Sequence, residues 1–209
     1  MSEPNLTPRE ALDRLMDGNL RYAQNVRSVD SMLSHSHRDM QTQRPHTIML
    51  GCSDSRAPAE VVFDQGLGDL FVIRVAGNIV ASSQVGSVEF AAERFGTRLV
   101  VVMGHTGCGA IDATLEAMTS QAGPPSRGLL SIVDRVRPSI ESLLATDLAR
   151  DPDRLRREAI RANVRASVNQ LRHSSQILER MAERGDLAVV GAELDVATGA
   201  VAFFTGLPA

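Results

Sequence analysis

The sequence lacks any apolar segment long enough to span a membrane, and it lacks a strong excess of charge of either sign. Its longest strictly apolar runs, such as residues 99–103, are far shorter than the roughly 18 to 20 residues that a membrane helix needs. The first 20 residues carry six charged side chains, which excludes the apolar core of a signal peptide. The net charge of −3 argues against nucleic-acid binding. We therefore expect a cytoplasmic protein with no nucleic-acid and no membrane partner.

Aromatic residues and lysine are also scarce. Aromatic side chains make up 3% of the chain, Trp is absent, Tyr22 is the single tyrosine, and all 22 basic residues are arginine. The hydrophobic share of 43% and the charged share of 22% are close to the globular average. A chain of 209 residues with this composition suits one compact domain, or a small domain with an appendage, built on an aliphatic core.

Only two cysteines are present, Cys52 and Cys108. They allow a disulfide, two inert buried thiols, or two ligands to a metal. In a cytosolic protein, inert thiols are the default, because disulfides are rare there and free cysteine packs as a small apolar side chain. Their sequence neighbours change this interpretation in favour of metal ligands, as described below.

The hydrophobic pattern predicts an α/β fold with a mainly parallel sheet. Continuous apolar runs predict strands that are buried on both faces, and they alternate with helical segments, as in βαβ units. An N-terminal arm over residues 1–42 precedes the α/β domain, 43–209. A capping box at Thr7 starts its helix. We expect strands at 47–51, 70–75 and 99–103, a hairpin at the sheet edge from 187–194 and 201–204, and helices at 8–24, 58–64, 84–96, 108–120, 127–146 with a kink at Pro138, and 152–184.

Two predicted strands end in residues that suit a metal. Functional groups in open α/β sheets gather beyond the carboxyl ends of the strands. Cys52 follows the first strand, and His105 and Cys108 follow the third in an H-x-x-C spacing. If these strands are neighbours, the three side chains converge, and Cys, His and Cys are suitable ligands for tetrahedral Zn²⁺. No further cysteine closes a four-ligand structural site, so a catalytic zinc with one position left for water is predicted.

Asp54 and Arg56 lie close to the first predicted ligand. They allow an ordinary ion pair, or a pair in which Arg56 holds the Asp54 carboxylate beside the open metal position as a proton acceptor. The adjacent ligand favours the second interpretation. Asp54 is also close enough to become the fourth ligand itself in a closed form, and only Arg56 holds it back. Two thiolate ligands make a zinc-bound water a weak acid, so the hydroxide form, which favours release of Asp54, gains only as the pH rises. We therefore expect activity to increase between roughly pH 7 and 9.

Three segments together resemble the β-class carbonic anhydrases: C-S-D-S-R from Cys52, R-V-A-G-N from Arg74 and H-T-G-C-G from His105. The resemblance implies Zn²⁺ bound by Cys52, His105 and Cys108, catalysis by the Asp54 and Arg56 pair, and reversible hydration of CO2 to bicarbonate by a zinc-activated water. It also implies four parallel strands extended by an antiparallel edge strand. The arm would pack on a partner subunit in a homodimer or higher homo-oligomer.

The same resemblance implies three residues that contact the substrate: Gln43, the backbone amide of Gly109, and Phe71, which would line the site of the neighbouring subunit. Some members of the family also bind bicarbonate at an inhibitory pocket formed by a Trp, an Arg and a Tyr. In this sequence Met49 and Leu194 occupy two of those places and only Arg74 remains, so we expect this pocket to be absent. Two alternatives stay open: a carbonyl sulfide or carbon disulfide hydrolase on the same zinc site, and a non-catalytic zinc-binding module.

Overall fold

The protein is built around a five-stranded sheet. The computed structural model describes residues 5–26, 43–119 and 126–208. Its strands follow the order β2-β1-β3-β4-β5, in which the first four are parallel and β5 runs antiparallel to β4. This arrangement confirms the predicted parallel sheet with an antiparallel edge strand. The strands are β1 (Thr47–Gly51), β2 (Leu70–Arg74), β3 (Leu99–His105), β4 (Ala188–Leu194) and β5 (Val201–Thr205).

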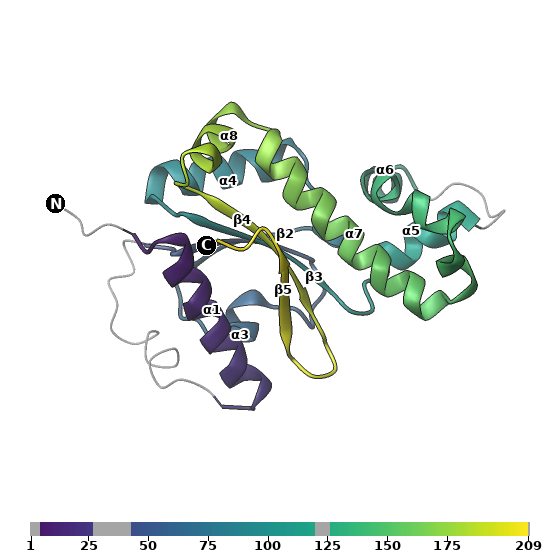
Figure 1. The fold of residues 1–209 in the computed structure, drawn as a ribbon, viewed down its shortest axis with the longest axis horizontal. Coiled ribbons are helices and arrows are strands. Elements are labelled where there is room, and N and C mark those ends of the chain that lie inside the picture. Colours follow the sequence, from purple (N-terminus) through teal and green to yellow (C-terminus); the bar gives the residue numbers. More distant parts are fainter. Residues whose placement is uncertain (1–4, 27–42, 120–125, 209) are drawn as a thin grey trace.

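Helices cover both faces of this sheet. Figure 1 shows α1 and α3 on one face, with α4, α7 and α8 on the other, while α5 and α6 lie to one side, where the chain leaves β3. None of the helices in the described ranges is long and apolar enough to cross a membrane. The helices are α1 (Pro8–Ala23), α3 (Ala59–Val62), α4 (Ser82–Phe95), α5 (Gly109–Thr119), α6 (Arg127–Ile140), α7 (Pro152–His173) and α8 (Gln176–Glu183).

The apolar core packed on the sheet has two layers, because successive strand side chains point to opposite faces of the sheet. A third buried cluster, among α5, α6 and α7, contains Cys52 and Cys108. In β1, Met49 packs in the layer under α1 and α3, whereas Ile48 and Leu50 pack in the layer under α4, α7 and α8. Both layers are almost wholly aliphatic, as the composition predicts. Burial on both faces explains why the central strands read as continuous apolar runs.

Helix α1 begins as the sequence predicts, with a reciprocal capping box between Thr7 and Glu10. It buries Ala11, Leu12 and Leu15 against the sheet of its own chain. Residues 27–42 of the predicted arm lie outside the described residues, so packing of the arm on a partner subunit stays a prediction.

The structure corrects the ends of several predicted helices. The segment predicted as one helix over 152–184 is two, because Ser175 caps a new helix by accepting hydrogen bonds from the Ile177 and Leu178 amides. The helix predicted over 127–146 continues past Pro138 but ends at Ile140. Two 3₁₀ helices follow it, η2 (Glu141–Ala145) and η3 (Asp147–Arg150). The strand predicted at 47–51 has these ends in the structure, and the remaining predicted helices and strands are present with ends shifted by one or two residues.

Candidate metal centre

The two strands that carry the predicted ligands are neighbours. β1 pairs in parallel with β3, and Gly51 lies opposite Met103 at the carboxyl ends of the pair. Cys52 directly follows β1, His105 is the last residue of β3, and Cys108 directly precedes α5. The predicted convergence of these three residues is therefore confirmed.

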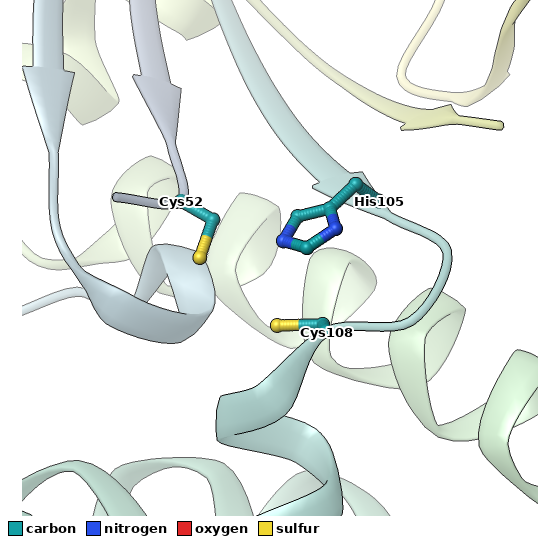
Figure 2. A group of neighbouring side chains, drawn as sticks. All are labelled: Cys52, His105 and Cys108. Carbon is teal, nitrogen blue, oxygen red and sulfur yellow. The ribbon is translucent and has the colours of Figure 1, made fainter. Parts of the chain in front are cut away.

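The three side chains form a compact, buried group. Their ligand atoms all lie within 4.8 Å of one another, and each residue is at most 5% exposed. Figure 2 shows both sulfur atoms and one imidazole nitrogen pointing toward a common centre. In tetrahedral zinc sites, bond lengths near 2.3 Å to sulfur and 2.0 Å to nitrogen separate neighbouring ligand atoms by about 3.5 to 3.8 Å. The observed group therefore needs only a small contraction to bind such an ion.

The hydrogen bonding of His105 prepares this side chain to be a ligand. Its Nδ1 lies 3.0 Å from the carbonyl oxygen of Thr106, which can only accept, so Nδ1 carries the proton. The other nitrogen, Nε2, is buried and has no hydrogen-bond partner in the described part of the chain. A buried lone pair without a partner is costly unless a cation takes it.

The two thiols compete for a single proton. A hydrogen bond from Cys108 lowers the pKa of Cys52 to about 4, and the same hydrogen bond is the main cause that raises the pKa of Cys108. The amides of Ala110 and Ile111, in the first turn of α5, act in the opposite direction and lower the pKa of Cys108. A divalent cation stabilises both sulfurs as thiolates at once, so this donor set fits a metal.

Asp54 and Arg56 form a close ion pair next to this group. Arg56 donates from Nε to one carboxylate oxygen at 2.9 Å and from a terminal nitrogen to the other at 2.8 Å. The same terminal nitrogen of Arg56 also donates to the carbonyl oxygen of Gly107, which connects the ion pair to the segment that carries His105 and Cys108. Hydrogen bonds from Arg56 hold the pKa of Asp54 well below its usual range. The carboxylate therefore stays ionised throughout the neutral range.

The Asp54 carboxylate lies beside the metal-type group, which consists of the side chains of Cys52, His105 and Cys108, without being part of it. Its Oδ2 is 3.8 Å from Nε2 of His105, but both of its oxygens are engaged by Arg56. This arrangement places a negatively charged acceptor next to the point at which Cys52, His105 and Cys108 converge. The closed form, in which Asp54 would be a ligand, stays a prediction.

Arg74 acts on the same loop from the end of β2. Its guanidinium donates to the carbonyl oxygen of Cys52 at 3.0 Å and to that of Asp54 at 2.6 Å. Met49 and Leu194, the two residues that led us to expect no inhibitory pocket, are fully buried in the apolar core. Arg74 thus supports the metal loop in this protein, an assignment that the sequence reasoning missed.

Of the three predicted substrate contacts, only Gly109 lies next to a predicted metal ligand. Gly109 is the first residue of α5, is exposed and directly follows Cys108. Gln43 is exposed and lies before the amino end of β1, whereas Cys52 follows its carboxyl end. Phe71 is half-buried in an aromatic cluster with Phe90 and Phe95. Within one chain, Gln43 and Phe71 are therefore not brought to the metal-type group, and the role of all three residues stays a prediction.

The fold and site define a class of protein: an α/β protein with a Cys-His-Cys metal site and an Asp-Arg pair at the carboxyl ends of a parallel sheet. A family model described as carbonic anhydrase matches residues 47–201. A carbonic anhydrase of Mycolicibacterium smegmatis is 37% identical over 199 residues, which cover 95% of this chain and 94% of that relative. Carbonic anhydrase 2 of Mycobacterium tuberculosis is 36% identical over 189 residues, 90% of this chain and 88% of the relative.

Solved structures agree with the sequence relatives. The β-carbonic anhydrase of Coccomyxa, determined in complex with acetazolamide, superposes with a TM-score of 0.73 at 25% identity over 92% of this chain and 86% of that one. A tetrameric β-carbonic anhydrase of Sordaria macrospora superposes with a TM-score of 0.69 at 27% identity over 78% and 82% of the two chains. This chain belongs to the β-class carbonic anhydrases.

The site predicts how metal content should depend on single side chains. We expect near-stoichiometric Zn²⁺ in the parent protein and a large loss of it in Cys108→Ala, because two protein ligands bind the ion far more weakly than three. Elemental analysis of the purified proteins measures this. Ser53→Ala, which alters an exposed neighbour of Cys52, is the control and should keep its zinc. Full zinc retention in Cys108→Ala would remove Cys108 from the ligand set.

Proposed function

We propose that this protein catalyses the reversible hydration of CO2 to bicarbonate and a proton, with Zn²⁺ held by Cys52, His105 and Cys108. The observation that carries this proposal is the Asp54 and Arg56 pair beside the three converging ligand atoms. A purely structural metal site would need no ionised carboxylate held next to the ligands. The names of the relatives support the same reaction.

The chain divides the work of the reaction between a metal and a proton acceptor. When bound, Zn²⁺ with three protein ligands supplies an activated water as the nucleophile for the weakly electrophilic CO2. Asp54 accepts the proton lost from this nucleophile, since its carboxylate is ionised and adjacent to His105 Nε2. Arg56 keeps the carboxylate in place and prevents it from approaching the ligands. The amide of Gly109 faces the substrate.

We further propose that the complete site forms in a homodimer or higher homo-oligomer. Gln43 and Phe71 lie away from the metal ligands of their own chain, so they would serve the site of a neighbouring subunit. Exposed Phe90, at 53%, extends the aromatic cluster of Phe71 to the surface, where it is available for burial between subunits. The tetrameric relative from Sordaria macrospora supports assembly from several copies.

The role of Asp54 can be tested by replacing its charge. Asp54→Asn keeps the size of the side chain but removes the proton acceptor, so we expect kcat/KM for CO2 to fall about 100-fold or more while zinc content is unchanged. Stopped-flow CO2 hydration measures the rate, and turnover of carbonyl sulfide is followed in parallel to distinguish the two substrates. Asp112→Asn, an acidic residue on α5 that pairs with Arg156, is the matched control. An Asp54→Asn enzyme as fast as the parent would contradict the proposed role.

The pH dependence of activity distinguishes the contribution of the metal-bound water from that of the Asp54 carboxylate. Asp54 is already ionised at pH 7 because its pKa is lowered, so its titration cannot increase activity above that pH. We nevertheless expect kcat/KM to rise between about pH 7 and 9, since two thiolates cancel the charge of Zn²⁺ and weaken its activation of water relative to three neutral imidazoles. Arg56→Ala should free the Asp54 carboxylate and bias the site toward the closed form, so we expect a lower rate in this variant. A flat parent profile from about pH 6.5 to 9 would overturn this account.

Mixing two inactive variants tests whether subunits share a site. Neither Gln43→Ala nor Asp54→Ala should hydrate CO2 efficiently alone. If Gln43 serves the partner's site, each mixed dimer has one site with both residues intact, and random exchange should restore about a quarter of parental activity. Size-exclusion chromatography with light scattering monitors the assembly. Mixing Asp54→Ala with Arg56→Ala is the control, because both residues act in the same chain and no complete site forms. No recovery in the first mixture would place Gln43 outside the partner's site.

A further inference from the structure

A hydrogen bond reaches the sulfur of a predicted metal ligand from a segment that carries no ligand itself. The backbone amide of Gly77 donates to the sulfur of Cys52, with a donor-to-sulfur distance of 3.4 Å, in a buried environment. Gly77 lies in the short turn η1 (Ala76–Asn78), which follows β2. An amide that donates to a thiolate withdraws electron density from the sulfur, and such outer contacts tune metal sites.

The turn has a backbone conformation that needs external support. Gly77 has φ 70° and Asn78 has φ 43°, so two consecutive residues adopt left-handed geometry. For Asn78 this conformation is unfavourable, and such strain persists only where surrounding structure imposes it. The side-chain amide nitrogen of Asn78 has no hydrogen-bond partner among the described residues, so this group does not hold the turn.

Helix α7 supplies the support. Asn163 donates from Nδ2 to the carbonyl oxygen of Gly77 at 2.8 Å, and Ser167 donates from Oγ to that of Asn78 at 3.2 Å. Both side chains are at least 96% buried. Their spacing of four residues puts them on one face of the helix, above the turn. The opposite side of Gly77 is also closed, because a Cβ there would lie 3.0 Å from Cβ of Ala110 in α5.

We infer that Asn163, assisted by Ser167, is a positioning residue for the metal site. By donating a hydrogen bond to the Gly77 carbonyl, Asn163 sets the orientation of the turn and so keeps the Gly77 amide directed at the Cys52 sulfur. The contact reduces the electron donation of one of two thiolates to the metal. It therefore offsets part of the charge that a Cys-His-Cys ligand set places on the ion.

The test uses the full-length protein loaded with Co²⁺, whose thiolate-to-metal charge-transfer absorption reports the electron density on sulfur. In Asn163→Ala we expect this absorption to move to longer wavelength, because the sulfur loses a hydrogen-bond donor. We also expect metal affinity, measured by chelator competition, to fall about tenfold, because loss of the contact that orients the Cys52 side chain outweighs the stronger donation from its sulfur. Ser167→Ala should shift both readouts in the same direction by less, and it decides the question if Asn163→Ala does not fold.

Gln170→Ala is the matched control. Gln170 lies on the same face of α7 and donates to the carbonyl of Val80 at 3.4 Å, beyond the turn, so its loss should leave both readouts at parental values. Unchanged absorption and affinity in the Asn163 and Ser167 variants would overturn the inference and leave these residues a purely structural role. The inference rests on the proposed metal site, and the two failures differ: a parent that binds no Co²⁺ contradicts the site itself, whereas a parent with normal absorption and unshifted variants contradicts only the role of Asn163.

Discussion

The parallel pairing of β1 between β2 and β3 is the constraint on which the site depends. Gly51 lies opposite Arg74 on one side and opposite Met103 on the other. Three loops that are far apart in the sequence therefore leave the same edge of the sheet side by side. The first carries Cys52 and Asp54, the second carries the η1 turn, and the third begins after His105 and carries Cys108. A shift of one residue in either pairing would turn every side chain of β1 to the other face and separate the ligands.

Charge balance explains the arrangement around the three ligand atoms. Two thiolates and one carboxylate would bring three negative charges into a small volume, and a divalent ion with the Arg56 guanidinium brings three positive ones. The site as a whole is then neutral, which lowers the cost of burying it. Arg56 donates to the Asp54 carboxylate, while Arg74 and Gly77 donate to atoms of Cys52. The Asp54 carboxylate and the Cys52 sulfur thus each have a donor from the protein.

The direction of β1 explains why Gln43, a predicted substrate contact, lies away from the ligands of its own chain. Residues before a parallel strand and residues after it lie at opposite edges of the sheet, so Gln43 cannot reach the ligands at the far end of β1 in its own chain. A second copy of the chain can bring such a residue to the site. If the proposed assembly holds, oligomerisation is part of the catalytic site itself, and stability of the assembly and activity should be linked.

The sequence by itself determined the α/β class, the strands and the choice of Cys52, His105 and Cys108 as candidate ligands, because these depend on local patterns. Buried parallel strands are continuous apolar runs, and H-x-x-C across a strand-to-helix turn is a local spacing. It did not determine the ends of the helices. Whether the chain stays helical at Ser175 or after Ile140 depends on packing as well as on helical propensity. Nor could it determine what Arg74, Gly77 and Asn163 contact. Those hydrogen bonds join residues 20 to 86 positions apart. Only the tertiary structure decides them, because a polar side chain in an apolar helix face shows that a partner is needed without showing which carbonyl it will be.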